Sequence, residues 1–319
     1  MTILLALALL SPPAVRGVAI APHYEGTRSP AQVTRMVDEI ADLGANTLQV
    51  VVQWGQETIE STAIAPYRWG TDDAEVRRVL RHARARGLKA LVFPIVRLKV
   101  QGPGQWRGKL KPADRAAWWA AYRAFVLHYA KLAADEGAAM LSVGSELGTM
   151  EADEVEWRRL VRDVRRVFDG KLTYSANWDH FTHVGFWDAL DYVGLNAYHP
   201  ITTRNDASED ELRRSWTLIR QQLERWLDFV DRPLLFTEVG YPSVDGGAVR
   251  PYAHAAKGPV DLEEQRRAWQ AFVDAWRGHP RLAGVFVWIW SGAGGASDIG
   301  YMPKGKPAED VLRRYFGGG

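Results

Sequence analysis

The chain has 319 residues, 47% of them hydrophobic and 24% charged, a balance that is typical of a globular protein with a large core. Its 40 Lys and Arg residues nearly cancel its 38 Asp and Glu residues, so the formal net charge is only +2. No sustained basic run favours binding to nucleic acid. Cysteine is absent, which excludes disulfides, thiolate metal sites and cysteine nucleophiles. With no HExxH motif either, we predict neither a metal site nor a cofactor.

The N-terminal segment, residues 1–16, contains an apolar run over residues 3–10 that Ser11, Pro12 and Pro13 interrupt. This pattern resembles the hydrophobic part of an export signal, although no basic residue precedes it. The run is too short to span a membrane as a helix. Alternatively, the segment packs against the folded domain. We expect a secreted or periplasmic protein whose folded domain covers residues 17–319.

From Gly17 onward, short apolar or β-branched runs alternate with longer segments of helical periodicity. We predict strands over residues 17–21, 47–53, 88–96, 139–143, 171–175, 192–196, 234–237 and 283–290. We predict helices over residues 30–43, 73–86, 113–136, 153–168, 186–189, 209–230, 262–277 and 308–315. Parallel strands need crossover helices, so this alternation predicts a single α/β domain, a (β/α)8 or TIM barrel. An open doubly wound sheet would carry a glycine-rich phosphate turn after its first strand, and residues 21–26 do not form one.

Polar and aromatic residues follow several of the predicted strands, where β/α barrels carry their chemistry. Indole faces stack on sugar rings, whereas amides and charges bind the rims of those rings, so we predict contacts to an oligo- or polysaccharide. The candidate substrate-binding residues are His23, Trp54, Arg97, Asn177, Trp178, Trp288 and Trp290. Strand alternation directs Trp288 and Trp290 to the same face, where either could equally pack in the core. The long loops over residues 54–72 and 97–112 are predicted to wall an elongated cleft, with Trp69 or Trp106 exposed to it.

Two glutamates stand directly after apolar strands, Glu146 after the fourth and Glu238 after the seventh. A buried carboxylate is costly without a task or a partner. Each could pair with an arginine at the rim, but the occurrence of two favours a catalytic pair. Glycoside cleavage needs one carboxylic acid to protonate the leaving oxygen and one carboxylate to attack the sugar or to activate water. Tyr198, after the sixth strand, could bond the nucleophile or could simply be a buried tyrosine bonded to the backbone.

Three segments, over residues 142–147, 193–198 and 235–241, resemble glycoside hydrolase family 113, a family of retaining β/α-barrel glycosidases. The resemblance extends from Arg16 to Ala308. Characterised members are endo-β-1,4-mannanases, so it implies that activity, with Glu146 as acid/base and Glu238 as nucleophile. Many related enzymes have Asn where this chain has Ser145, and that Asn binds the sugar 2-hydroxyl. The contact would here come from elsewhere, such as Asn177 or His23.

Two alternative functions stay open at this point. One is a carbohydrate-binding barrel without catalysis, which the presence of both glutamates disfavours. The other is a barrel lyase or isomerase, which would need a Schiff-base lysine or a phosphate-binding loop. No lysine follows strands four to seven, although Gly292, Gly294 and Gly295 follow strand eight. We expect a monomer with a glycan substrate, no nucleic-acid partner and no membrane span.

Overall fold

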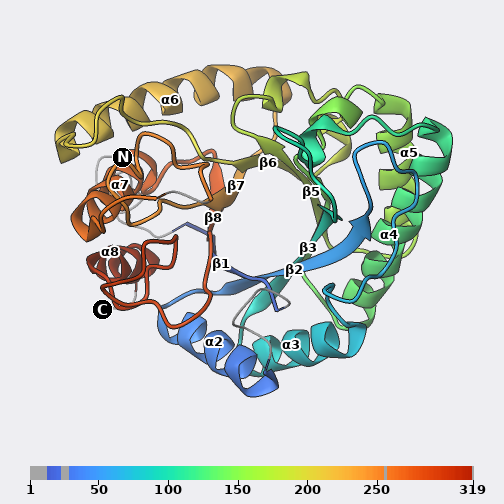
Figure 1. The fold of residues 1–319 in the computed structure, drawn as a ribbon, viewed down its shortest axis with the longest axis horizontal. Coiled ribbons are helices and arrows are strands. Elements are labelled where there is room, and N and C mark those ends of the chain that lie inside the picture. The colour runs from blue at the N-terminus through green and yellow to red at the C-terminus, as the bar shows by residue number, and fades with distance from the viewer. Residues whose placement is uncertain (1–12, 23–28, 255–256, 318–319) are drawn as a thin grey trace, which may run out of the picture.

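The computed structural model describes residues 13–22, 29–254 and 257–317, and its strands form one closed parallel barrel in the order β1 to β8 (Figure 1). The strands are β1 (Val15–Ile20), β2 (Thr47–Gln56), β3 (Lys89–Leu98), β4 (Met140–Ser145), β5 (Lys171–Asn177), β6 (Tyr192–Asn196), β7 (Leu234–Val239) and β8 (Leu282–Val287). Pairing of β1 with β8, with Gly17 opposite Phe286, closes the ring. The predicted (β/α)8 barrel is therefore confirmed.

Helices cover the outside of the barrel, as Figure 1 shows. They are α2 (Pro30–Asp42), α3 (Asp73–Ala85), α4 (Arg115–Asp135), α5 (Glu154–Arg165), α6 (Glu209–Val230), α7 (Leu262–Trp276) and α8 (Pro307–Phe316). Four 3-10 turns lie in the connections, namely η1 (Arg107–Lys109), η2 (Gly148–Met150), η3 (Phe181–His183) and η4 (Trp187–Ala189). The crossover from β5 to β6 holds only η3 and η4, so this connection is shorter than the others. Among the described residues, none of the helices is both long and apolar enough to cross a membrane.

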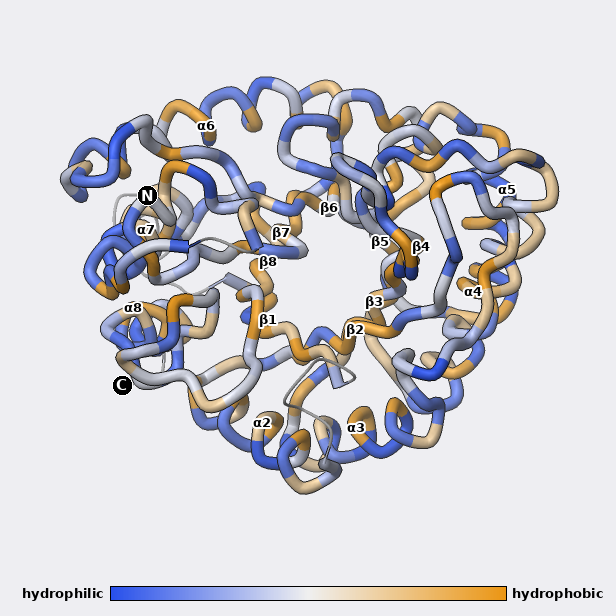
Figure 2. Tube along the Cα trace, in the orientation of Figure 1, coloured by the Kyte–Doolittle hydropathy of each residue, from blue (hydrophilic) through white to orange (hydrophobic). Residues whose placement is uncertain are grey.

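Local sequence signals explain where these helices begin. Ser29 caps α2 and Pro30 occupies its first turn, while Ser208 and Glu211 form a reciprocal capping box at the start of α6. Figure 2 shows helices whose residues alternate between hydrophilic and hydrophobic, around strands that are largely hydrophobic. This pattern is expected where each helix buries one face against the barrel and exposes the other.

The two faces of each strand fill two different cores. On β2, Val50 and Val52 pack outward against the helices, whereas Val51 packs inward. The inward cluster also contains Leu91, Phe93 and Phe286, so large side chains fill the lower part of the barrel and leave no pore there. Alternation then continues upward along each strand, and it decides which residues near the strand ends face the centre.

Gly194 lies at a tightly packed point of the barrel, two residues before the end of β6. A Cβ atom there would lie 2.2 Å from the backbone oxygen of Tyr174 and 2.4 Å from Oγ1 of Thr173. The Tyr174 oxygen belongs to the β5 backbone and cannot move without disturbing the sheet. The absence of a side chain at Gly194 therefore lets β5 and β6 pair closely below the candidate site.

We expect Gly194→Ala to lower the free energy of unfolding by about 1–3 kcal/mol or more, because it overpacks a rigid core. Urea denaturation monitored by tryptophan fluorescence measures the change. Gly185→Ala is the matched control, since its Cβ would meet only the flexible Glu154 side chain on the surface. Equal, small effects of the two substitutions would contradict this account of the interior.

Candidate active site

Register shifts in β4 and β7 accompany the two acidic side chains, Glu146 and Glu238, at the C-terminal end of the barrel. Between β4 and β5, the step from Ser142 to Ser145 advances three positions on β4, whereas the paired step from Thr173 to Ser175 advances two on β5. Between β6 and β7, Leu195 and Asn196 pair with Phe236 and Glu238, so β7 also contains one extra residue. An extra residue of this kind breaks strict alternation and re-aims the side chains that follow it. Each glutamate lies at or directly after such a shift.

Glu146 is held in an unusual backbone conformation and by two side-chain donors. Its φ is 55°, in the left-handed region that non-glycine residues rarely adopt, and such strain is concentrated at functional sites. The side chain of Asn196 donates to Oε1 at 2.8 Å, and Nη2 of Arg107 donates to Oε2 at 2.5 Å. The Glu146 amide donates to the backbone oxygen of Ser175 at 2.9 Å. The carboxyl is thus anchored on both oxygens.

Asn196 is fully buried, and hydroxyl groups from the neighbouring strands fix its amide. Its Oδ1 accepts hydrogen bonds from Ser175 Oγ at 2.6 Å and Thr237 Oγ1 at 3.0 Å. These two donors require the oxygen at that position, so the amide nitrogen faces Glu146. Residue-by-residue prediction did not assign Asn196 to the site. An asparagine at the inward-facing end of an apolar strand is the sequence signal that could have identified it.

Glu238 lies deeper than Glu146, with only 2% of its surface exposed, and the phenol of Tyr198 donates to its Oε2 at 2.7 Å. Burial raises the pKa of the Glu238 carboxyl well above its usual range, and the Glu146 charge adds to this, whereas Arg107 and Tyr198 oppose it. Burial and the Glu238 charge also raise the pKa of Tyr198, which keeps the phenol protonated as a donor. Because the Glu146 charge disfavours a second negative charge on Glu238, one proton on the pair is favoured. The predicted contact between Tyr198 and Glu238 is therefore present.

Aromatic rings from the loops after β7 and β8 surround Tyr198. The ring centroids of Tyr198, His254 and Tyr301 lie 6.0, 6.0 and 5.6 Å apart, pair by pair. The Tyr301 hydroxyl donates to the backbone oxygen of Pro251. His254 and Tyr301 were not predicted from the sequence, because both lie in long loops where no periodicity places them.

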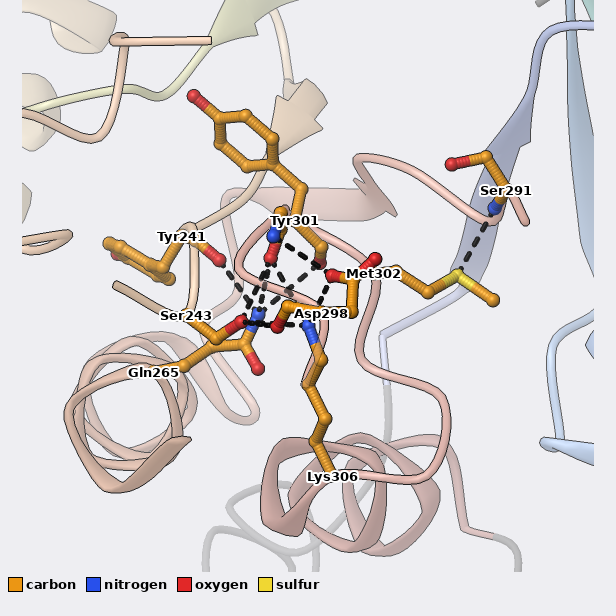
Figure 3. Close-up of polar contacts among 9 residues, drawn as sticks. Tyr241, Ser243, Gln265, Ser291, Asp298, Tyr301, Met302 and Lys306 are labelled. Atoms are coloured by element: carbon orange, nitrogen blue, oxygen red, sulfur yellow. Dashed lines mark hydrogen bonds and ion pairs between the residues drawn. The ribbon is translucent and has the colours of Figure 1, made fainter. Parts of the chain in front are cut away.

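A buried lysine ties the loop after β8 to the loop after β7 (Figure 3). The side chain of Lys306 is fully buried, and its ammonium group donates to Ser243 Oγ and to Asp298 Oδ1, each at 2.7 Å. Gln265 of α7 donates to the backbone oxygens of Tyr241, at 2.8 Å, and Tyr301, at 3.4 Å. This network fixes the backbone that places Tyr301 beside Tyr198.

Three of the predicted substrate-binding residues lie at the same end of the barrel as the two glutamates. Asn177 ends β5 directly opposite Asn196. Arg97 is exposed and follows Leu91, Phe93 and Ile95 on the inward face of β3. Trp178 is half-buried, its ring nearly parallel to that of Tyr252 at 6.5 Å.

The other predicted tryptophans lie elsewhere, because alternation and strand ends direct them differently. Trp54 shares the outward face of β2 with Val50 and Val52, and it packs on α4 with its ring 5.3 Å from that of Phe125. It is therefore not placed as a sugar platform. Strand β8 ends at Val287, so Trp288 and Trp290 do not share a face as predicted. Trp288 packs with the inward cluster, whereas Trp290 is buried and donates to Glu39 of α2 at 2.8 Å.

His23 lies outside the described residues, as does most of the N-terminal segment. Of the two loop tryptophans, Trp69 is 50% exposed and lines a cavity of about 550 Å³ near the start of α3, with the Arg68 guanidinium 4.0 Å from its ring. Trp106 is half-buried, and its ring packs over Gly108. Both loops thus present an indole, with that of Trp69 more open to solvent.

A cluster of three carboxylates in the described part of the chain, Asp245, Asp261 and Glu264, has its oxygens within 4.8 Å of one another. Asp261 caps α7 by accepting the Glu264 amide at 2.7 Å. Glu264 accepts the amides of Gly246 and Ala248, each at 2.8 Å. The cluster therefore supports the loop after β7 through backbone hydrogen bonds.

The fold and the site together define a class of protein. A parallel barrel that carries two buried carboxyls at the C-terminal ends of β4 and β7, with a tyrosine and an amide holding them, is typical of β/α-barrel glycoside hydrolases. The family model of Glycoside Hydrolase Family 113 matches residues 21–305, and the chain belongs to this family. It is therefore a glycoside hydrolase, an enzyme that acts on O-glycosyl bonds.

Solved structures agree with this assignment. The chain is 29% identical to β-mannanase AaManA from Alicyclobacillus acidocaldarius, solved in complex with ManMIm, over 97% of this chain and 99% of that one, with a TM-score of 0.85. It is 25% identical to another GH113 β-1,4-mannanase, over 95% and 98% of the two chains, with a TM-score of 0.83. A Faecalibacterium prausnitzii β-glucuronidase, at 14% identity and a TM-score of 0.66, covers 96% of this chain and 49% of its own and shares the fold alone. A comparison with curated proteins gives no significant match.

We expect Lys306→Met to lower the free energy of unfolding by about 1–3 kcal/mol, because Ser243 and Asp298 lose their buried donor. Chemical denaturation measures this loss. Lys304→Met is the matched control. Lys304 pairs with Glu39 at a partly exposed position, where the loss of an ion pair should lower the free energy of unfolding by about 1 kcal/mol or less. A Lys306 variant as stable as the Lys304 variant would show that the network does not hold the loop.

Proposed function

We propose that the protein is a retaining endo-β-1,4-mannanase in which Glu238 is the nucleophile and Glu146 the acid/base. The observation that carries the proposal is that residues at the end of β6 hydrogen-bond to both carboxyls. Asn196 donates to Glu146, and Tyr198, two residues further on, donates to Glu238. One strand end thus holds both groups in fixed positions, as double displacement at one glycosidic bond requires.

The two carboxyls differ in ways that suit different roles. Glu238 is buried, its Oε2 is held by Tyr198, and its Oε1 has no hydrogen-bond partner among the described residues. Oε1 is therefore the atom available to attack an anomeric carbon. Glu146 is 8% exposed and lies nearer the solvent side, where water can reach it for the second step. We assign attack to Glu238 and proton transfer to Glu146 on this basis.

The reaction proceeds in two balanced steps. In the first, a carboxylate oxygen of Glu238 bonds to the anomeric carbon while Glu146 gives its proton to the departing glycosidic oxygen. In the second, Glu146 takes a proton from water, whose oxygen bonds to the anomeric carbon and breaks the ester to Glu238. Two inversions retain the β configuration, and both carboxyls return to their initial states.

The substrate assignment is supported by the neighbouring enzymes, which are described as β-1,4-mannanases. The exposed face of Trp178 beside Tyr252 offers a stacking surface for a sugar next to the cleavage point. Arg97 and Asn177 are polar groups placed to bond its hydroxyls.

A panel of polysaccharides tests the activity directly. We expect the release of reducing ends to be fastest from β-1,4-mannan, compared with β-1,4-glucan, β-1,4-galactan and β-1,4-xylan. Viscosity should fall early, because internal cuts shorten chains faster than cuts at the ends. Proton NMR should show the β anomer first. Preference for another glycan would contradict the substrate, and initial formation of the α anomer would contradict retention.

Azide separates the roles of the two glutamates. Glu146→Ala should cleave unactivated substrates about 10²–10⁴-fold more slowly, because no acid protonates their leaving group. On an activated aryl β-mannoside, azide should rescue this variant and give the β-mannosyl azide. Glu238→Ala should lose turnover, and any azide product should be the α-mannosyl azide, since azide then attacks in place of the carboxylate. NMR of the azide products measures this difference. The opposite pair of configurations would reverse the assignment.

Trp178→Ala should raise KM for mannan oligomers about 2–13-fold, which corresponds to the loss of about 0.5–1.5 kcal/mol of stacking. Trp54→Ala is the matched control, because Trp54 packs on α4. That variant should have a lower melting temperature and a KM near that of the wild-type enzyme. Steady-state kinetics and a melting curve of both variants decide between the two positions, and a KM effect at Trp54 alone would overturn the assignment.

A further inference from the structure

The loop after β3 brings a cation to the acid/base glutamate. Arg107 begins the turn η1, which packs on η2, the turn that follows Glu146. Oγ1 of Thr149 in η2 donates to the backbone oxygen of Leu110 at 2.7 Å, and a Cβ at Gly148 would lie only 3.1 Å from the backbone oxygen of Gly108. The position of Arg107 is therefore built into the packing of two catalytic-end loops.

Arg107 contacts Glu146 at two points. Its Nη2 lies 2.5 Å from Glu146 Oε2, and its Nε donates to the backbone oxygen of Ser145 at 3.3 Å. The side chains of Arg107 and Glu146 are 23% and 10% exposed, so solvent screens the pair only partly. The contact is a charge-assisted hydrogen bond between the guanidinium and the Glu146 carboxylate.

This arrangement favours the proton on Glu238, whereas the first step needs it on Glu146. Glu146 has a cation and an amide donor, whereas Glu238 is buried with Oε1 unbonded among the described residues. The empty site therefore favours a proton on Glu238. Glycosyl transfer requires the proton on Glu146 and a charged Glu238.

We propose that Arg107 is a positioning residue that exchanges contacts during the catalytic cycle. Its guanidinium pairs with ionised Glu146 in the empty site, leaves Oε2 when a sugar enters the leaving-group side, and pairs again after Glu146 has given up its proton. The inference rests on the proposed roles of Glu146 and Glu238. On substrate entry one proton passes from Glu238 to Glu146 through solvent, so the total charge of the pair is unchanged.

Several titratable groups face the pair, and they set what a pH experiment reports. Tyr198, two residues after β6, and His254, from the loop after β7, lie beside the two glutamates. Loss of hydration lowers the pKa of His254, although the residue is exposed; the Glu146 charge opposes this effect, and the Arg107 charge adds to it. On the η2 side, the carboxyl of Glu151 pairs with His180 at 2.5 Å.

The sign of the expected change follows from the positive charge of Arg107. This charge lowers the pKa of Glu238, so its removal should move the acid limb of the kcat/KM profile, which needs ionised Glu238, to higher pH. The alkaline limb, which needs one proton on the carboxyl pair, should move in the same direction. The whole bell should therefore shift upward by about one pH unit.

The experiment compares Arg107→Met, Arg107→Gln and Arg107→Lys across pH, with mannan oligomers as substrate. The Met and Gln variants should both shift the two limbs of the kcat/KM profile to higher pH, and the Lys variant should keep them near their wild-type positions. Lys109→Met removes the same charge from the exposed end of the same turn, and it should leave the limbs in place. Because Gln keeps a donor at the site, it provides a second test if Met unfolds the loop.

Unmoved limbs in the Met and Gln variants would overturn the inference, as would an equal shift in Lys109→Met, which would indicate general surface electrostatics. A change confined to KM, with the same pH profile, would make Arg107 a substrate-binding residue only. Failure of the proposed function gives a different result. In that case the azide products of the Glu146 and Glu238 variants have the wrong configurations, whatever the Arg107 variants do.

Discussion

The central constraint of this structure is the burial of two carboxyls beside each other at one end of a closed barrel. Two such groups cannot both ionise at low cost, so the surroundings have to decide where charge resides. The protein meets this constraint with an amide and a guanidinium on Glu146 and a phenol on Glu238. The strained backbone at Glu146 and the hydroxyl network below Asn196 keep these donors in place.

The barrel contributes rigidity, and the irregular parts contribute the chemistry. Regular pairing and an apolar lower core fix the strand ends, while the register shifts in β4 and β7 bring extra polar groups to the centre. Each loop then adds one element. The loop after β3 supplies Arg107, and the loop after β8 supplies Tyr301. Hydrogen bonds from Lys306 and Gln265 fix the backbone around Tyr301. The positions of Glu146 and Tyr198 thus depend on contacts between residues that are far apart in the chain.

The fold could be predicted from periodicity alone, since strand and helix patterns alternate clearly and each predicted strand is present. The contact between Tyr198 and Glu238 was also predictable, because strand ends converge at one mouth. Trp54 shows an avoidable error, since counting from Val50 and Val52 places it outward. Trp290 was harder, because the end of β8 at Val287 leaves no visible signal in an apolar run. Arg107, His254 and Tyr301 lie in loops whose paths depend on tertiary packing, and the sequence pattern does not encode those paths locally.

The central claim is that Glu238 forms the covalent bond to the sugar while Glu146 only moves protons. A 2-deoxy-2-fluoro-β-mannoside with a good leaving group slows the second step, so the glycosyl enzyme accumulates. Intact mass and peptide mapping of the trapped enzyme test the claim most directly. The account predicts one added sugar, attached to Glu238. A label on Glu146, or rapid turnover of the substrate with no detectable label on any residue, would contradict it.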